Sequence, residues 1–524
     1  MTYDSAEVLS ARYGPAWRWL VTVSGMVGVV AMVLSMTTVN VAVPDVMGAF
    51  GIGQDKAQWM SSAFAAMMAA GMVLNSWITG IFAERRTFLM SLAVFSCGAV
   101  LGGMAPNEDV LIFARVLQGF AAGVGQPLVM AMIFSVFPAD RRGLAMGVFG
   151  LGVVFAPAIG PTLGGVMIEF FSWRYVFFIA LPFCAVAAVM GSLFMPTAAI
   201  PKVIPRFDWI GLLLMGVGLA GLMIGFAYGQ SEGWTSDVTL LRLGAGVAGT
   251  ILLVWWELRF DKPLVNIRMF ANRQFASASL IAFLFGAGMM ASTYLVPVFV
   301  QTVVQFTPLM SGLMVMPAGI MLAVIFPTAG RLADMVPPAI MIVGGLFLFA
   351  IGFHVMSGTD ANSTFWSLAG ITMISRLGLG FINPSLNISS LNALPPDQVR
   401  QGAGAVNLMR QLGGAFGTIL FVAFLETRNR FHADALAATQ DYANRTTDLL
   451  INDLKHMLKL AGLPEQVQRA NAIDYLGSMV QAQSLMLAFQ DSFLLLAGVI
   501  LLAVPPALVL SQSQRRATRM ARTA

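Results

Sequence analysis

Residues Gly147 to Pro182 read GVFGLGVVFAPAIGPTLGGVMIEFFSWRYVFFIALP, a long apolar segment interrupted by glycine and proline. In water, an interior glycine costs a helix about 1 kcal/mol and an interior proline about 3 kcal/mol. In a membrane these residues are tolerated, because neighbouring helices satisfy the freed backbone groups. Small residues four apart also let two helix backbones approach closely. The segment therefore predicts a membrane helix that can kink and pack tightly.

The composition of the whole chain points to the same class. Of its 524 residues, 58% are hydrophobic and 10% are charged, and the mean hydropathy is +0.79. Soluble domains carry about 25% charged residues, so we expect an all-α polytopic membrane protein with about 14 transmembrane helices. The net charge of +5 does not indicate nucleic-acid binding, because the basic residues stand in loops beside apolar spans, where they set orientation.

Two motifs in the opening segment carry a family resemblance. Residues 156–165, APAIGPTLGG, resemble the antiporter motif in the fifth helix of exporters of the major facilitator superfamily. Residues 173–179, WRYVFFI, are similar to the W-R-x-x-F-x-I signature of drug exporters in that superfamily. On glycine spacing alone, a general packing face in the membrane is an equal alternative. The residues of the antiporter motif are Gly160, Pro161, Gly164 and Gly165.

The first predicted span, Trp17 to Val43, ends in a polar strip. Residues 35–44 read SMTTVNVAVP. Unpartnered polar groups in hydrocarbon are costly, so we expect Ser35, Thr38 and Asn40 to face the interior of the bundle, along the substrate pathway. The strip resembles the D-x-T-I-x-N-V-A-x-P signature of drug exporters, with Ser35 where that family has an acidic residue.

The fourth predicted span contains an arginine. Residues 111–119 read LIFARVLQG, which matches the R-x-x-Q-G motif of the superfamily. Arg115, Gln118, Ala122 and Gln126 share one helix face by their spacing. An intramembrane arginine marks a functional site by default, and the alternative is an arginine that extends to the membrane surface near a helix end. We expect Arg115, Gln118 and Gln126 along the substrate pathway.

Two related loops indicate a duplicated chain. Residues 80–86, GIFAERR, are a shortened form of the superfamily's loop between helices two and three, and residues 330–334, GRLAD, are a closer copy. Duplicated halves with a substrate site at their interface are common in secondary transporters. The resemblance implies gating roles for Gly80, Glu84, Arg85, Gly330 and Asp334.

Two apolar segments near residues 208–228 and 240–258 exceed a six-plus-six plan. They indicate the 14-helix drug:proton antiporter family (EmrB/QacA type), and the chain looks closest to EmrB-like inner-membrane exporters. Residues 244–249 fit G-x-G-x-x-G, but no βαβ unit surrounds them, so we expect no nucleotide site. The predicted organisation is a cytoplasmic N-terminus (1–16), an N-terminal six-helix half (17–195), a connector with the two extra helices (196–273), a C-terminal six-helix half (274–511) and a basic cytoplasmic tail (512–524).

The second half carries further resemblances to this family. Residues 294–301, YLVPVFVQ, and 407–415, NLMRQLGGA, resemble its motifs, and the latter is a signature of the 14-helix branch. Asn383 and Asn387 are four apart, as are Asn407 and Gln411, so each pair shares a helix face. The predicted substrate pathway in this half comprises Tyr294, Gln301, Asn383, Asn387, Asn407, Arg410 and Gln411.

Residues 426–484 break the apolar pattern before the last span and form the longest predicted loop. Its position resembles EmrB-like exporters, which implies a periplasmic membrane-fusion adaptor (EmrA-like) and an outer-membrane channel as partners. The basic residues of the loops, from Arg85 to the tail, fall on one side of the predicted spans. By the positive-inside rule both termini are cytoplasmic, the protein lies in the bacterial inner membrane, and residues 426–484 face the periplasm.

The sequence shows neither a catalytic set nor a metal-ligand spacing nor a Walker loop, so we expect no enzyme activity, no metal and no cofactor. Transport would then use an ion gradient. The resemblance implies proton antiport, yet no acidic residue stands near the middle of a predicted span. The remaining proton-coupling candidates are Asp491 and Glu169, near the outer ends of their helices, and Asp491 could equally cap its helix.

Arg115, Arg376 and Arg410 are the principal predicted buried charges, and all three are positive. We therefore hypothesise a multidrug exporter for hydrophobic, anionic or weak-acid compounds, with a lining to which some of the 35 methionines contribute. One alternative is a dedicated exporter of a single metabolite, fatty acid or siderophore. Another is a membrane scaffold or sensor that transports nothing, against which the polar interior strips count.

The extra helix pair makes a prediction about topology. A reporter fused after Gln230 should report the periplasm, and one fused after Lys262 should report the cytoplasm, because one helix separates the two positions. Paired phosphatase and fluorescent-protein fusions measure this directly. Two fusions reporting the same side would contradict the 14-helix plan.

Overall fold

The computed structural model describes residues 5–197, 207–260, 263–440 and 444–511. The side chains at positions 40, 54, 55, 58, 154, 155, 157, 158, 161, 227, 228, 230–232 and 308 lie outside this description. Two predicted site residues, Asn40 and Pro161, are therefore outside the described side chains. So are Lys202, Arg206, Lys262 and the arginines of the tail, which lie outside the described ranges.

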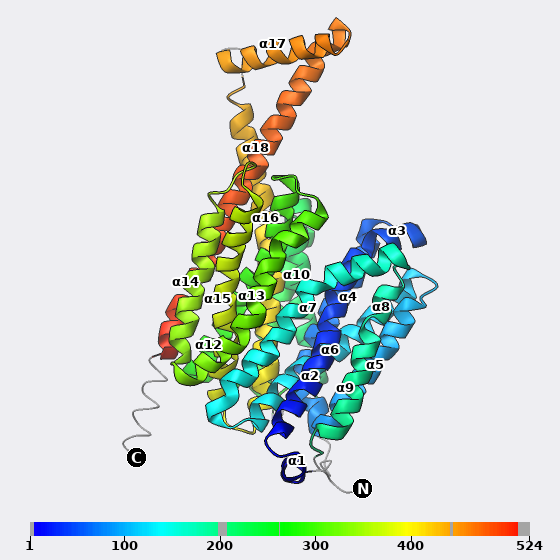
Figure 1. Cartoon of the computed structure of the whole chain (residues 1–524), viewed down its shortest axis with the longest axis vertical. Helices are drawn as coiled ribbons and strands as arrows, with labels where there is room; N and C mark the ends of the chain where they lie inside the picture. The colour runs from blue at the N-terminus through cyan, green and yellow to red at the C-terminus, as the bar shows by residue number, and fades with distance from the viewer. Residues whose placement is uncertain (1–4, 198–206, 261–262, 441–443, 512–524) are drawn as a thin grey trace.

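Every regular element of the described ranges is helical (Figure 1). The first half consists of α1 (Ala6–Tyr13), α2 (Ala16–Val41), α3 (Val43–Phe50), α4 (Gln54–Phe82), α5 (Glu84–Gly103), α6 (Glu108–Val136), η1 (Ala139–Arg141), α7 (Arg142–Phe170), α8 (Tyr175–Phe178) and α9 (Ala180–Phe194). The inserted pair is α10 (Trp209–Glu232) and α11 (Asp237–Glu257). The second half consists of η2 (Ile267–Ala271), α12 (Arg273–Thr302), α13 (Pro308–Met335), α14 (Pro338–Met356), α15 (Phe365–Asn392), α16 (Val399–Ala437), α17 (Arg445–Leu460) and α18 (Glu465–Leu501).

Thirteen helical segments of the described residues are long and apolar enough to cross a membrane. α7, which is not among them, has 29 residues and the length to make a fourteenth. With α7 included, the order is six spans, then the inserted pair, then six spans. The predicted all-α polytopic fold is confirmed, and it rests on helices because only they and closed barrels satisfy every backbone group in hydrocarbon.

Polar side chains set where several helices begin. The side chain of Asn107 accepts a hydrogen bond from Val110 N at 3.0 Å at the start of α6. Asn272, Thr307 and Thr364 occupy the same position before α12, α13 and α15. Such caps satisfy N–H groups that the helix itself leaves free.

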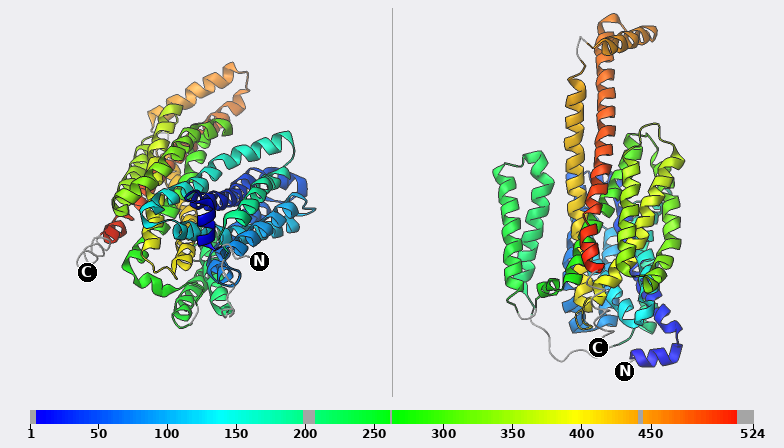
Figure 2. Two further views of the ribbon diagram at one scale, coloured as in Figure 1. Left: turned by 60° about the horizontal axis from the view of Figure 1, so that its bottom comes forward. Right: turned by 90° about the vertical axis from the view of Figure 1, so that its left-hand side faces the viewer.

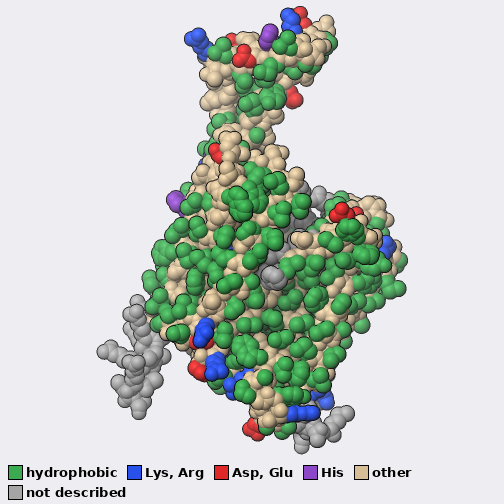
Figure 3. All heavy atoms as spheres, in the orientation of Figure 1, with side chains coloured by type: hydrophobic (Ala, Val, Ile, Leu, Met, Phe, Trp, Pro, Cys, Tyr) green, Lys and Arg blue, Asp and Glu red, His purple; other side chains and the backbone are tan. Residues whose placement is uncertain are grey.

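The two halves form separate bundles that meet along α7, α13, α4 and α16. We call the face of the molecule that carries α1 and the end of α18 the terminal face, and we call the opposite face the hairpin face (Figure 1). The bundles converge at the terminal face and diverge toward the hairpin face. The space-filling view shows the surface indented between the two lobes on the hairpin side (Figure 3).

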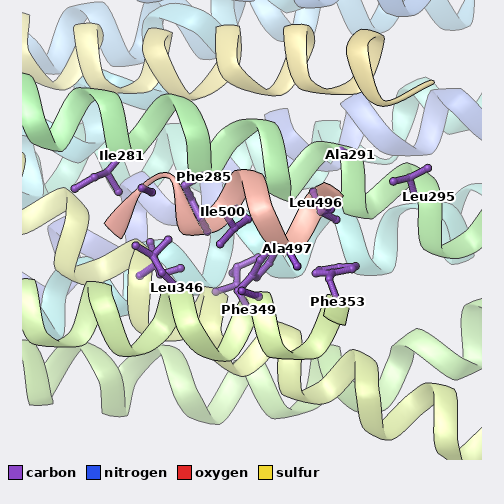
Figure 4. Close-up of a cluster of buried hydrophobic side chains, with 14 of the residues drawn as sticks. Ile281, Phe285, Ala291, Leu295, Leu346, Phe349, Phe353, Leu496, Ala497 and Ile500 are labelled. Atoms are coloured by element: carbon purple, nitrogen blue, oxygen red, sulfur yellow. The ribbon is translucent and has the colours of Figure 1, made fainter. Parts of the chain in front are cut away.

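The second half is held by a phenylalanine-rich core. α18 packs against α12 and α14, with Leu496, Ala497 and Ile500 among aromatic side chains (Figure 4). The rings of Phe299 and Phe493 lie 5.4 Å apart edge to face. In lipid these contacts act through close packing, because the surrounding chains are as apolar as the side chains themselves.

Glycine brings the backbones of α7 very close to both halves. A Cβ on Gly160 would lie 2.1 Å from Thr37 Oγ1 of α2, and one on Gly147 would lie 2.3 Å from the carbonyl oxygen of Phe326 in α13. A Cβ on Gly330 would meet the carbonyl oxygen of Gly143 at 2.4 Å. The glycines of the opening segment thus join α7 to its own bundle at one end and to the opposite bundle at the other.

The inserted pair stands beside the main bundle (Figure 2). Its two helices pack through glycine: a Cβ on Gly221 would lie 2.6 Å from Gly246 N, and one on Gly249 would lie 2.8 Å from Gly218 N. Two glycines of the G-x-G-x-x-G sequence therefore serve helix packing, which explains the pattern without a nucleotide.

The polar segment 426–484, expected as a loop, is largely helical. α16 continues 39 residues to Ala437, about 58 Å, where a span needs about 30 Å. α18 already begins at Glu465, and α17 lies across the tip (Figure 2). The two spanning helices, α16 and α18, continue beyond their apolar regions. The change in hydropathy therefore marks the boundary of the membrane-spanning part and does not mark the end of either helix.

The glycine packing of the inserted pair can be tested by one substitution. Gly246→Leu should lower the free energy of unfolding by about 1–3 kcal/mol, because the new side chain collides with the backbone of α10. Thermal unfolding of the purified protein measures this. Gly244→Leu is the matched control, since a Cβ there meets nothing within 4 Å. Equal losses in the two variants would refute the packing role.

Candidate functional site

Arg115, two turns from the start of α6, is fully buried within the first half. Its Nε donates to the carbonyl oxygen of Met60 at 3.1 Å, and its Nη1 donates to Gln118 Oε1 at 2.9 Å. Nη1 also lies 3.4 Å from Ser35 Oγ, which Gln118 Nε2 approaches at 3.4 Å. The structure therefore brings together three of the predicted residues, from α2 and α6.

The partners of this guanidinium are neutral. Arg115 Nη2 has no hydrogen-bond partner, and the ring of Phe64 lies 4.2 Å from the guanidinium carbon. Among the described residues no carboxylate forms an ion pair with Arg115. With serine at position 35, the positive charge of Arg115, which arginine does not lose in proteins, has no counter-ion among the described residues.

A small recess of about 10 Å³ lies beside this cluster, between α2, α4 and α6. Gln126 lies in it, 5% exposed, and its Oε1 has no hydrogen-bond partner. The apolar lining includes three methionines, whose flexible side chains adapt to different shapes. The lining is Val29, Met32, Val33, Met36, Phe64, Met68, Ala122 and Gln126.

The terminal face is closed by a carboxylate from the second half. Asp334 of α13 accepts hydrogen bonds from Gly143 N at 2.5 Å and from Leu144 N at 3.0 Å, the first turn of α7. A helix N-terminus carries a partial positive charge, so this contact combines capping with charge–dipole attraction. The predicted gating residues Gly330 and Asp334 therefore lie directly at the junction of the halves.

A second contact of this kind joins α5 to α16. Glu84 pairs with Arg400 at 3.8 Å, near the start of α16. Arg85 instead stays within its own half, where it donates to Thr197 Oγ1 at 2.8 Å and to the carbonyl oxygen of Ser192. A Cβ on Gly80 would meet nothing within 4 Å, so backbone packing does not require a glycine there.

Polar residues of the second half lie near the junction. Asn407 Nδ2 donates to the carbonyl oxygen of Ala403 at 2.9 Å and approaches Met130 Sδ of the first half at 3.1 Å. Arg410 Nη2 donates to Asn407 Oδ1. Gln411 is half-buried, one turn along from Asn407.

Asn383 and Asn387 are both buried on α15, and their side chains are hydrogen-bonded at 3.1 Å, as their spacing predicts. Asn387 Oδ1 keeps no partner. Gln301 approaches Ser311 Oγ at 3.4 Å, whereas Tyr294 is 42% exposed. These residues do not converge on one point with Arg115 in the conformation described.

The three arginines differ in exposure. Arg115 is fully enclosed, whereas the surfaces of Arg376 and Arg410 are partly accessible. Helical spacing predicts which face of a helix carries an arginine. It does not predict whether that face lies in the interior of the bundle or at its margin.

Thr38 is buried on α2, and its Oγ1 has no partner. A Cβ on Gly164 would lie 2.9 Å from the carbonyl oxygen of Thr38, while one on Gly165 would meet nothing within 4 Å. Two of the antiporter-motif glycines, Gly160 and Gly164, thus let α7 approach the polar strip of α2.

The comparisons with known proteins agree with this architecture. The model of the Major Facilitator Superfamily matches residues 25–418. The chain belongs to the major facilitator superfamily. It is a transporter and not an enzyme, as predicted. Lincomycin resistance protein LmrB of Bacillus subtilis is 29% identical over 75% of this chain and 82% of its own length. The multidrug resistance protein B homolog of Mycobacterium tuberculosis is 29% identical over 78% and 76%, respectively.

A solved structure shows the fold as well. The human organic anion transporter MFSD10 aligns with a TM-score of 0.60 at 14% identity, over 92% of this chain and 99% of its own. The superfamily fold places the contact between α7 and α13 in a functional frame. A transporter that opens to alternate sides must be able to break the junction that closes its terminal face.

The two proton-coupling candidates of this transporter differ in their surroundings. Glu169 is exposed near the end of α7. Asp491 was expected near a helix end, but it lies well inside α18, because α18 begins at Glu465, and it caps nothing. Its Oδ2 lies 2.7 Å from Arg428 Nε and 2.7 Å from His432 Nε2 of α16.

Several contacts were not foreseen from sequence. Arg142 Nη1 donates to Asn392 Oδ1 of the second half at 3.0 Å, and Arg428 and His432 join Asp491 from a segment predicted to be a loop. The Arg141–Arg142 pair beside a predicted span is the sequence signal that indicates a charged contact at this end of α7. Nothing in the sequence paired His432 with a residue 59 positions later.

The carboxylate of Asp334 should control the closed state of the terminal face. Asp334→Ala removes its capping bonds to α7 and should shift the ratio of closed to open conformers roughly 5–30-fold toward open, for about 1–2 kcal/mol lost. Distances between spin labels at the exposed positions 140 and 397 measure this in the purified transporter. Asp334→Asn keeps an acceptor without the charge and should fall between the two.

Asp453→Ala, which removes an exposed carboxylate on α17, serves as the control. An unchanged distance distribution in Asp334→Ala would mean that the contact between α7 and Asp334 does not hold the face closed.

Proposed function

We propose that this transporter exports hydrophobic, anionic or weak-acid compounds across the inner membrane by proton antiport. The observation that carries the proposal is Arg115, a fully buried guanidinium whose described partners are all neutral. A buried charge is costly unless it is paired. An anionic group entering between the halves would supply the missing counter-ion.

The serine at position 35 favours an anionic substrate over a cationic one. In the family that the first helix resembles, an acidic residue stands at this position and would neutralise the arginine. Here Ser35 Oγ offers only a weak 3.4 Å contact to Arg115. A cationic substrate would therefore meet repulsion where a carboxylate or sulfonate would find attraction.

The hydrophobic preference rests on the recess beside Arg115. Seven of its eight lining residues are apolar, and three of these are methionines, whose flexible side chains adapt to different shapes. The relatives named for lincomycin resistance and multidrug resistance support drug-like substrates and export over import.

Proton antiport rests on the absence of a Walker loop in the sequence and on Asp491, the better placed of the two candidates. His432 and Arg428 share Asp491 Oδ2. This cluster is the proposed site of proton uptake, whereas Glu169 is exposed near the end of α7.

The hairpin of α16, α17 and α18 supports partnership with a periplasmic adaptor and an outer-membrane channel. It extends well beyond the bundle and carries exposed apolar side chains, including Leu449, Met457 and Tyr475. Lys and Arg side chains gather at the terminal face (Figure 3). By the positive-inside rule that face is cytoplasmic and the hairpin is periplasmic.

The decisive experiment compares an anionic and a cationic dye in sealed vesicles with an imposed proton gradient. Arg115→Ala should lower transport of the anionic dye at least about 10-fold, because a charge-assisted contact of about 1.5–3 kcal/mol is lost, and should leave the cationic dye unchanged or faster. Ser35→Asp should do the same by supplying an internal counter-ion.

Arg430→Ala, an exposed arginine beyond the bundle, is the charge-matched control and should transport both dyes like the unmodified protein. Equal clearance of both dyes by Arg115→Ala would refute selection by charge. Transport that persists without a proton gradient would refute antiport while leaving the substrate class open.

A further inference from the structure

The base of the inserted pair, at the terminal face, holds two buried carboxylates. Asp208 precedes α10 and is 2% exposed, and Glu257 ends α11 and is 1% exposed. Both belong to segments that the substrate pathway does not use. Carboxylates are rarely enclosed to this extent unless they are paired.

The two side chains converge over Gly211. A Cβ on that glycine would lie 2.5 Å from Asp208 Oδ2 and 3.0 Å from Glu257 Oε1, so the two carboxylates occupy the space of one missing side chain. Asp208 Oδ1 accepts from Gly211 N at 2.7 Å and from Trp256 Nε1 at 2.9 Å. Glu257 Oε1 accepts from Val265 N at 3.4 Å.

One oxygen of each carboxylate has no partner. Asp208 Oδ2 and Glu257 Oε2 are buried, and neither has a hydrogen-bond partner among the described residues. Buried polar atoms are nearly always satisfied, so two orphaned oxygens within one small site indicate a missing donor.

The charged groups nearby are engaged elsewhere in the described part of the chain. Arg259 lies over the ring of Trp255 at 4.1 Å, and Arg268 Nη2 donates to the carbonyl oxygen of Leu258 at 2.9 Å. Arg400 of α16 pairs with Glu84 of α5. From α10, the only acidic group that faces Glu257 among the described residues is Asp208.

Two like charges this close, and out of water, cannot both stay ionised without a large free-energy cost. A single proton would neutralise one carboxylate, and the hydroxyl so formed would supply the donor that this site lacks. We propose that Asp208 and Glu257 bind one proton between them and form a protonation site at the base of the inserted helix pair.

The site is connected to the junction of the two halves. The segment that Glu257 holds through Val265 also contains Pro263 and Leu264, whose carbonyl oxygens accept from Gln401 Nε2 at 3.1 and 3.3 Å. Gln401 is the neighbour of Arg400. Loss of the proton places two negative charges at this anchor and loosens the inserted pair from α16. This holds for any substrate that the transporter carries.

The test is infrared titration of the purified full-length transporter. The carbonyl-stretching band of a protonated carboxyl, identified by its shift in D2O, should appear in the unmodified protein and disappear as the pH rises. Glu257→Gln and Asp208→Asn should each remove that band, since one carboxylate alone keeps no shared proton. Glu465→Gln, which changes an exposed carboxylate, should leave it in place.

Thermal unfolding gives a second readout, which does not depend on the infrared band. A proton held in the folded state and released on unfolding makes stability fall as pH rises. The unmodified protein should show this slope, and Glu257→Gln should flatten it.

Three results would overturn the proposal. One is a titrating band that survives in both variants, and another is a stability slope identical in Glu257→Gln. The third is loss of the band at constant pH when Na⁺ or Mg²⁺ is added, which would make the pair a cation site.

Discussion

Every polar group that enters hydrocarbon must find its partner inside the protein, and this constraint governs the whole structure. Helices satisfy their own backbones, so what remains is how closely the helices can approach and where the remaining side-chain charges go. Close approach of the helices depends on glycine at positions such as Gly147, Gly160 and Gly246, where a Cβ would collide with a neighbouring helix. The second question is answered differently at each charged residue.

At the terminal face the answer is a carboxylate placed on the start of a helix from the other half. Asp334 of α13 needs no cationic side chain, because two backbone N–H groups at the start of α7 and the dipole of that helix serve instead. Such a contact is strong when aligned and vanishes when the helix shifts. That property suits a junction that a transporter must break and re-form.

Arg115 and the pair Asp208–Glu257 are the places where partnering is incomplete. Within the described part of the chain, the guanidinium has no anionic partner, and one oxygen of each carboxylate has no donor. Buried charges and polar atoms without a partner are costly in a static fold. In a transporter they mark where a bound ion or substrate completes the structure. An anion at the first site and a proton at the second are the simplest completions.

The sequence by itself determined the polytopic helical class, the two related halves and the inserted pair, because hydropathy over a span length depends only on composition. It also selected Arg115 with Gln118 and Asn383 with Asn387, since helical spacing places these pairs on one face. It does not separate an irregular loop from a helix that leaves the membrane, so it did not predict the helices within residues 426–484 or the position of Asp491 inside α18.

Only the tertiary structure decided which of the predicted residues meet and which gaps in their partnering remain. Asp334 and Leu144 are 190 positions apart, and Asp208 and Glu257 come together only because two helices pack through their glycines. Contacts between distant segments depend on how helices pack, and no local pattern encodes that.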